Sequence, residues 1–313
     1  MAEHGPGAAS VVAVDVGGTT MKGALVDAAG AVVREASRPT PAPAGSEAVV
    51  EALLELIAQL RGDGAAAVGV VVPGHVDAEA GCVRFSANLG LRDLPLRARL
   101  ERATGLPVRI DHDVRAAGLA EDAVGATTGV DDSVLVVIGT GVAAVVRSGG
   151  RVIGGATGAA GELGHIPVWP DGEPCRCGQR GCLERYASAS AIARRYADRT
   201  TAGAFTAAGT LTAADVLARR AVDEHAQRVW DEAIQALALA FSTATMLLDP
   251  QLIVIGGGLS NAGGALLEPV RAELGRLVRW REPPRVVLSP LRARGGLIGA
   301  ALLAREIGIV QSS

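Results

Sequence analysis

Aromatic residues are scarce in this chain of 313 residues, which holds only three Trp, two Tyr and three Phe. A hydrophobic core must therefore be built mainly from Ala, Val, Leu and Ile. Apolar residues make up 49% of the sequence, and 41 residues are glycine. This composition is typical of a globular protein with many tight turns. The length is sufficient for two domains of ordinary size.

The sequence also lacks the features of membrane, exported and nucleic-acid-binding proteins. No uninterrupted apolar run reaches the roughly 18 residues of a membrane span, and the first ten residues contain no apolar h-region of a signal peptide. A net charge of −3 implies no basic face for nucleic acid or an anionic membrane. We therefore expect a cytoplasmic protein with no nucleic-acid partner and no membrane partner.

Cysteine is also rare, but three of the four cysteines are clustered while Cys82 stands alone. In a reducing compartment such a cluster favours metal binding over a disulfide. One imidazole and three thiolates form a set of the kind that binds Zn²⁺ tetrahedrally. The predicted ligands are His165, Cys175, Cys177 and Cys182. Four protein ligands leave no open coordination position, so this zinc would be structural.

Three apolar runs that predict buried strands each end in a glycine-rich turn, at residues 15–20, 139–141 and 256–258. Glycines allow backbone N–H groups to approach phosphate oxygens, and threonine hydroxyls add donors. Asp15 could hold Mg²⁺, because hard cations prefer oxygen ligands. The turns together predict a nucleotide-binding cleft, and none of them fits the P-loop or the dinucleotide fingerprint. The predicted nucleotide-binding residues are Asp15, Gly17, Gly18, Thr19, Thr20, Lys22, Gly139, Thr140, Gly141, Gly256, Gly257 and Gly258.

The second half of the chain repeats the plan of the first. Apolar runs at 11–14 and 133–138 each lead through a Gly/Thr turn into a second run, at 23–26 and 142–146. The likeness lies in the order of strands and turns rather than in the letters, and it suggests two related halves. Predicted helices include one N-capped by Ser46, one at 96–104 that ends at Gly105, and others from about Val114, at 212–221, at 223–248 and at 296–307.

Asp113 follows a predicted strand at 108–110 and precedes a predicted helix. Aspartate is a good N-cap residue, so local structure alone can explain this position. The helix dipole would also keep the carboxylate ionised, which allows it to accept a proton from a hydroxyl that attacks a phosphoryl group. The two interpretations are compatible.

Five segments occur in the order seen in the ROK family, which is named for repressors, open reading frames and kinases. They are DVGGTTMK (15–22), DHDVRAA (111–117), GTG (139–141), GELGH (161–165) and CRCGQRGCLE (175–184). The chain resembles this family over about residues 11–310. The resemblance implies an α/β fold of the two-domain actin-like ATPase (ribonuclease H-like) type, with a cleft between the domains. The implied domains are 11–117, completed by a C-terminal helix at about 296–313, and 118–295 with the zinc-binding loop.

The resemblance also implies an activity and the roles of individual residues. Asp113 matches the base that takes the proton of the sugar C6 hydroxyl in this family, so the resemblance implies an ATP-dependent and Mg²⁺-dependent hexose kinase. Its partners would be a small-molecule sugar, ATP and a second copy of the chain, because dimers are common in the family. The residues matched to sugar contacts are Asn88, His112, Asp113, Glu162, His165 and Glu184.

The sequence departs from ROK glucokinases beside the base. His112 stands where they commonly have Asn, Leu91 where they often have Trp, and Ala143 and Ala144 where glycines are common. An imidazole can donate, accept or become charged near pH 6.5. It could therefore suit an amino sugar such as 3-amino-3-deoxyglucose (kanosamine) beside glucose, with N-acetylmannosamine as an alternative substrate.

The alternative function is that of a sugar-responsive ROK-type regulator or sensor without kinase activity. We do not expect a repressor, because a first strand at Val11 leaves no room for a winged helix-turn-helix ahead of it. The presence of Asp15, Asp113 and the glycine turns argues against a catalytically silent sensor.

Overall fold

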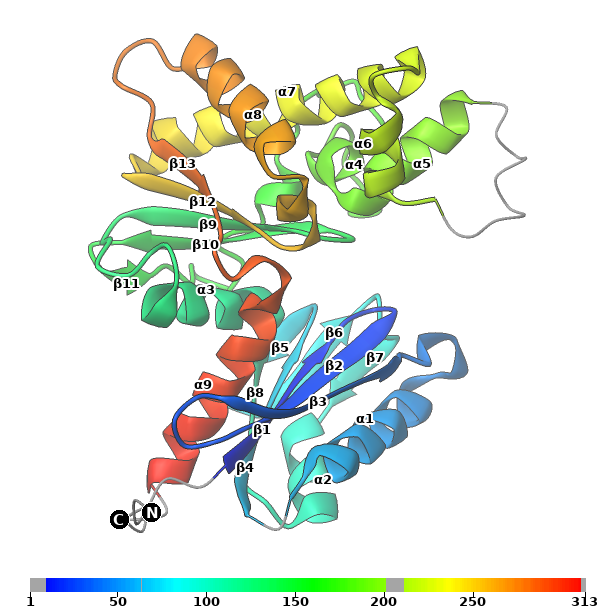
Figure 1. The fold of residues 1–313 in the computed structure, drawn as a ribbon, viewed down its shortest axis with the longest axis vertical. Helices are drawn as coiled ribbons and strands as arrows, with labels where there is room; N and C mark the ends of the chain where they lie inside the picture. The colour runs from blue at the N-terminus through cyan, green and yellow to red at the C-terminus, as the bar shows by residue number, and fades with distance from the viewer. Residues whose placement is uncertain (1–9, 63, 201–210, 311–313) are drawn as a thin grey trace. The chain divides into compact units, whose positions relative to one another are not determined.

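The computed structural model describes residues 10–62, 64–200 and 211–310, which divide into two compact units (Figure 1). The first unit holds the chain up to Ala120 and from Arg294 onward, and the second holds Glu121–Ala293. The prediction that the first ten residues form no signal peptide concerns residues 1–9, which lie outside the described residues. The end of the predicted C-terminal helix, residues 311–313, also lies outside them. Within the described ranges, no helix combines the length and apolar character needed to span a membrane.

A five-stranded sheet forms the centre of the first unit, in the order β3-β2-β1-β4-β8. The first three strands form an antiparallel meander, and the last two add to β1 in parallel. Near-continuous apolar runs bury β1 and β4 on both faces, as is typical of central parallel strands. The strands are β1 (Ser10–Val16), β2 (Thr20–Val26), β3 (Val32–Pro39), β4 (Ala65–Val72) and β8 (Val108–His112).

Helices cover both faces of this sheet, as Figure 1 shows. Val12 and Val14 of β1 pack in one apolar cluster with α1 (Ser46–Leu60) and α2 (Leu96–Thr104). The alternating residues of β1 pack in another cluster with α9 (Gly295–Val310). The backbone of α9 approaches β4 so closely that a Cβ on Gly69 would lie 1.9 Å from the carbonyl oxygen of Ala300.

The second unit contains a sheet with the same order and the same strand directions, β11-β10-β9-β12-β13. Strands β9, β10 and β11 form an antiparallel meander, and β12 and β13 add to β9 in parallel. This shared topology confirms the prediction of two related halves. The strands are β9 (Ser133–Ile138), β10 (Val142–Ser148), β11 (Arg151–Val152), β12 (Leu252–Gly256) and β13 (Arg285–Leu288).

The long helix α7 (Glu224–Leu248) organises the core of the second unit. Its side chains Trp230 and Phe241 are almost fully buried among residues of β9 and β12. Two of the few aromatic residues therefore lie at the centre of this core. The other helices of the second unit are α4 (Glu184–Ala187), α5 (Ala189–Arg199), α6 (Ala213–Arg219) and α8 (Gly264–Leu277).

Two details of the first unit differ from the sequence-based expectations. The first is a small antiparallel sheet that the sequence did not predict, because its strands of three to five residues are too short to show an alternation of apolar and polar residues. Its strands are β5 (His75–Asp77), β6 (Cys82–Ser86) and β7 (Leu91–Leu94). The prediction of Ser46 as N-cap is wrong, since Ser46 is the first residue of α1 and Gly45 is the N-cap. Gly45 has a φ of 96°, a conformation that turns the chain into the helix at no steric cost to glycine.

Candidate active site and metal centre

Asp15 and Asp113 are two carboxylates of the first unit that interact electrostatically. Asp15 lies in β1, and Asp113 is the first residue of α3 (Asp113–Val124), directly after β8. Burial and the negative charge of Asp113 raise the pKa of Asp15 to about 7, although Lys22 on the paired strand acts in the opposite direction. Mg²⁺ prefers oxygen ligands, so the carboxylate of Asp15 is of the kind that could hold this ion.

The start of α9 lies against the same carboxylate. A Cβ on Gly296 would come within 2.8 Å of Oδ2 of Asp15. Only a glycine leaves this space beside the carboxylate, so the first turn of α9 forms part of the wall around Asp15.

Asp113 lies in the sequence Asp-His-Asp, whose first aspartate has a different role. Asp111 forms an ion pair with Arg115, whose Nε lies 2.8 Å from Oδ1 of Asp111. Oδ1 of Asp113 instead accepts the backbone N–H of Val114 at 2.8 Å and lies 3.2 Å from Nε2 of His112. No lysine or arginine pairs with Asp113 within the described part of the chain, so its charge is not neutralised by a fixed cation.

The first glycine turn joins β1 to β2 and is fixed by Thr40, a residue that sequence reasoning missed. The hydroxyl of Thr40 donates to the carbonyl oxygen of Gly17 at 2.7 Å, and its backbone N–H donates to Thr19 at 2.9 Å. Asn88 lies beside this turn, because a Cβ on Gly18 would come within 3.3 Å of the Asn88 Cβ. The side chains of Thr19 and Thr20 are exposed, which leaves their hydroxyls available to a ligand.

The two glycine turns of the second unit lie next to each other. The turn at 139–141 joins β9 to β10, and the turn at 256–258 follows β12, which pairs with β9. Gly257 has a φ of 78°, and a Cβ there would lie 2.5 Å from the carbonyl oxygen of Ile138. The close backbone approach at the end of β9 therefore requires a glycine.

A mostly apolar pocket of about 300 Å³ lies beside these two turns. Gly258 belongs to its lining, and the backbone N–H of Ala189, another lining residue, donates to the carbonyl oxygen of Gly139 at 2.8 Å. Sequence reasoning missed this pocket, because its walls come from separate segments of the chain. The lining residues are Ala189, Thr212, Ala213, Ala214, Leu217, Trp230, Gly258, Leu259, Asn261 and Ala262.

Glu184 is fixed against the turn at 139–141 rather than solvated on a helix. Its Oε2 accepts the backbone N–H of Val142 at 3.0 Å, and a Cβ on Gly141 would lie 2.7 Å from that oxygen. The segment with Glu162 and His165 packs along the same strand, since a Cβ on Gly164 would lie 2.1 Å from the carbonyl oxygen of Val142. The start of β10 therefore brings these three predicted sugar contacts into one region of the second unit.

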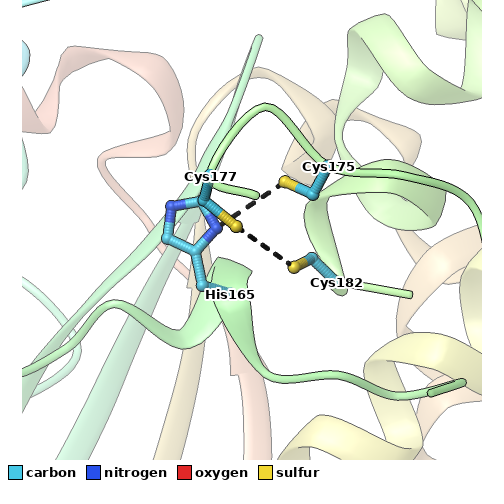
Figure 2. Close-up of side chains that lie close together, drawn as sticks. All are labelled: His165, Cys175, Cys177 and Cys182. Carbon is cyan, nitrogen blue, oxygen red and sulfur yellow. Dashed lines mark hydrogen bonds between the residues drawn. The ribbon is translucent and has the colours of Figure 1, made fainter. Parts of the chain in front are cut away.

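The four predicted metal ligands are grouped together, as Figure 2 shows. Their ligand atoms all lie within 4.8 Å of one another. The sulfur atoms of Cys177 and Cys182 are 3.7 Å apart, and Nδ1 of His165 lies 3.9 Å from the sulfur of Cys175. Zn–S bonds of about 2.3 Å in a tetrahedron would separate two sulfurs by about 3.8 Å. The donor set and its spacing therefore fit a zinc ion.

The electrostatics of the cluster also fit a cation. Burial and the neighbouring thiols of Cys177 and Cys175 raise the pKa of Cys182 to about 12. Thiolates packed this closely repel one another, and a bound metal ion removes that cost because it binds the deprotonated form.

The loop that carries the cysteines is fastened to the following helices through Glu173, which sequence reasoning also missed. The Glu173 carboxylate accepts Nε of Arg195 at 2.7 Å and Nη2 of Arg194 at 2.5 Å, and Arg185 lies 3.4 Å away. The hydroxyl of Tyr186 accepts the backbone N–H of Glu173 at 2.7 Å. The ring of Tyr186 in turn meets Trp169 edge to face, with centroids 4.4 Å apart.

Comparison with known proteins identifies relatives over nearly the whole chain. The model of the ROK family matches residues 11–307. A glucokinase of Halalkalibacterium halodurans is 36% identical over 94% of each chain. An N-acetylmannosamine kinase of Escherichia fergusonii is 34% identical over 95% of this chain and 98% of its own. The crystal structure of a ROK family glucokinase from Streptomyces griseus, in complex with glucose and AMPPNP, has a TM-score of 0.83 at 32% identity, over 95% of this chain and 99% of that one.

Proposed function

The chain belongs to the ROK family and has the actin-like ATPase fold, and on this basis we propose that it is an ATP-dependent hexose kinase that phosphorylates the C6 hydroxyl of its sugar. The observation that carries the proposal is the carboxylate of Asp113, which has no fixed cation among the described residues and interacts electrostatically with Asp15. The related glucokinases support the same reaction class.

In the proposed reaction, Asp113 is the general base. It accepts the proton of the C6 hydroxyl as that oxygen attacks the γ-phosphorus of ATP, and the bond between the γ-phosphorus and the bridging oxygen breaks to release ADP. Asp15 would hold Mg²⁺, which neutralises charge on the phosphates when bound. The predicted sugar contacts Glu162 and Glu184 offer carboxylates that can each accept two hydroxyls, which is how a polar sugar is distinguished from an apolar ligand.

We assign the base of the nucleotide to the apolar pocket of the second unit. Its volume of about 300 Å³ and its position beside the turns at 139–141 and 256–258 suit a purine with its phosphates on backbone N–H groups. Trp230 and Leu259 line this pocket and provide apolar surface for the ring.

We assign a structural role to the zinc ion. His165, Cys175, Cys177 and Cys182 would hold it, and the ion would fix the loop from which His165 approaches the predicted sugar contacts Glu162 and Glu184. Nε2 of His165 lies 3.9 Å from Glu162, which supports a shared role for the two side chains.

The identity of the sugar substrate is a separate and more specific part of the proposal. Relatives named glucokinase and N-acetylmannosamine kinase match this chain at 36% and 34% identity, a difference too small to choose between the substrates. His112 beside the base favours a glucose-like amino sugar such as kanosamine, for which the imidazole offers a hydrogen-bond acceptor. We also propose a cytoplasmic homodimer, which sedimentation velocity would test.

A coupled assay of ADP release tests the activity. We would compare kanosamine, glucose, N-acetylmannosamine, glucosamine, mannose and fructose as acceptors. Asp113→Asn should lower kcat by at least about 100-fold, because general-base catalysis contributes that much. Asp198→Asn, an exposed aspartate at the end of α5, should leave kcat unchanged. Wild-type kcat in the Asp113 variant would remove Asp113 from the mechanism, and faster turnover of glucose than of kanosamine would remove the preference for the amino sugar.

The second candidate function is a sugar-responsive regulator or sensor, as the family's repressors suggest. It would bind one of these sugars in a calorimeter but release no ADP with any of them. The Asp113 carboxylate, with which no lysine or arginine of the described residues pairs, is available as a base, and this favours the kinase.

A further inference from the structure

Nε2 of His112 lies 3.2 Å from Oδ1 of Asp113, the proposed base. We propose that His112 is a positioning residue, which donates its Nε2–H to Oδ1 of Asp113 and leaves Oδ2 as the oxygen that accepts the substrate proton. The catalytic meaning of this bond rests on the proposed kinase function. The bond itself does not, since it joins two residues of the first unit.

The position of His112 is fixed by a chain of hydrogen bonds. It is the last residue of β8, and its backbone N–H donates to Oδ1 of Asp111 at 2.7 Å. Asp111 is held by Arg115, whose Nη2 donates to the carbonyl oxygen of Val76 at 2.9 Å. The His112 side chain is 19% exposed, so its ring is mostly removed from water. A hydrogen bond in such surroundings orients its acceptor more strongly than one in water.

Both close contacts of the Asp113 carboxylate, one hydrogen bond and one near approach of an imidazole nitrogen, involve the same oxygen. Oδ1 accepts the backbone N–H of Val114 at 2.8 Å and lies 3.2 Å from Nε2 of His112. The χ2 torsion of aspartate is broad and roughly two-fold, so one contact alone would hold the carboxylate loosely. Two contacts on Oδ1 define which oxygen remains, and Oδ2 accepts no hydrogen bond from the described residues.

The other charged groups near Asp113 do not provide this contact. Asp15 faces it from β1 with a like charge, and Lys22 on β2 acts on Asp15. Arg115 from α3 is engaged by Asp111. Among the charged side chains of the described residues, His112 is therefore the one that lies close enough to donate to the Asp113 carboxylate.

This assignment also limits what His112 can offer to a sugar. With Nε2 committed to Asp113, only Nδ1 remains for a ligand. Nδ1 of a neutral imidazole with a protonated Nε2 is an acceptor and cannot donate. The ring would therefore select a hydroxyl or ammonium donor on the sugar, whereas the amide of an Asn at this position could donate as well as accept.

Two substitutions separate positioning of the base from sugar contact. His112→Phe removes the donor, and we expect kcat to fall by about 10- to 100-fold with a much smaller change in KM, because misplacing a reacting group by about 1 Å costs this much. His112→Gln carries an amide N–H about as far from the backbone as Nε2, so it should recover most of kcat. His225→Gln, on the exposed start of α7, is the matched control. A rise in KM with unchanged kcat in both variants would overturn the proposal.

A spectroscopic measurement tests the bond without turnover. The chain has only five histidines, so the ring nitrogens can be assigned in a long-range ¹H–¹⁵N spectrum at pH 8 with the His112 variants. We expect His112 as the Nε2–H tautomer, with a shift of Nε2 in Asp113→Asn. An Nδ1–H tautomer, or no response to that substitution, overturns the proposal. If no sugar yields ADP, the kinase proposal fails while this spectrum still decides the bond.

Discussion

Replacing Glu173 by Gln should destabilise the second unit, because this one carboxylate holds the cysteine loop to α5. It accepts Nε of Arg195 at 2.7 Å and Nη2 of Arg194 at 2.5 Å, and Gln can replace neither charge-assisted bond with full strength. Arg195 is only 7% exposed in its side chain, so its guanidinium cannot regain water when the carboxylate is lost.

The size of the effect follows from these contacts. Breaking a buried ion pair by removing one partner costs about 3–5 kcal/mol. Arg195 keeps a second partner, Glu232 at 2.6 Å, and Glu173 itself is 27% exposed, so we expect the lower end, about 3 kcal/mol. For a domain of this size, that corresponds to a fall of roughly 6–12 °C in Tm.

Differential scanning calorimetry of the zinc-loaded protein at pH 7 measures this change. Asp198→Asn is the matched control, because Asp198 also pairs with Arg194 but is 63% exposed and should cost less than about 0.5 kcal/mol. Equal Tm values for the Glu173 variant and this control would refute the reasoning.

The effect should also depend on pH with a definite sign. Burial alone would raise the pKa of Glu173, but the hydrogen bond from Arg195 and the charge of Arg194 outweigh it and hold the pKa below its usual range. A carboxylate with a lowered folded-state pKa stabilises the fold above its unfolded pKa of about 4.3 and loses that contribution as pH falls through the folded value. The Tm difference between wild type and Glu173→Gln should therefore be full at pH 7 and shrink below about pH 4.

Three further predictions follow from the site geometry. The pKa of Asp15 is raised to about 7, so its ionised form destabilises the fold as pH rises from about 4 to 7; Asp15→Asn should raise Tm without Mg²⁺ at pH 8 but not at pH 4, and an equal gain at both would contradict this. Gly257→Ala should lower stability by about 2 kcal/mol in urea unfolding, whereas Gly258→Ala, with nothing within 4 Å of its Cβ, should change little; equal effects would refute the close approach to Ile138. Elemental analysis should find about one equivalent of zinc in the wild type and in Cys82→Ser but none in Cys182→Ser, and retention of zinc in both variants would exclude the cluster as the zinc site.

The parts of the structure that the sequence predicts best depend on local patterns. The continuous apolar runs of β1, β4 and β9 predict central strands, and Gly105 in the left-handed conformation ends α2 where expected. The cysteine spacing likewise predicts the metal cluster. The three cysteines belong to one short loop, in which Gly178 and Gly181 adopt positive φ, so their sulfur atoms cannot lie far apart.

The features that sequence reasoning missed depend on contacts between distant residues. Thr40 reaches the turn at Gly17 from 23 positions away, and Glu173 meets Arg195 at a separation of 22. Nothing in the residues around Thr40 or Glu173 distinguishes them from an ordinary loop threonine and a surface carboxylate. His112 was expected as a sugar contact, and its contact with Asp113 became visible only when the ring was placed at the end of β8.

The scarcity of aromatic residues gives the protein a built-in optical probe. All three tryptophans and both tyrosines belong to the second unit, as Trp169, Tyr186, Tyr196, Trp230 and Trp280. Intrinsic fluorescence therefore reports the second unit alone, while far-ultraviolet circular dichroism reports the helices and strands of both. Trp230 lines the apolar pocket and Trp169 packs on Tyr186 beside the cysteine loop, so emission should respond to nucleotide and to zinc. The same chain then distinguishes unfolding of one unit from unfolding of both without any label.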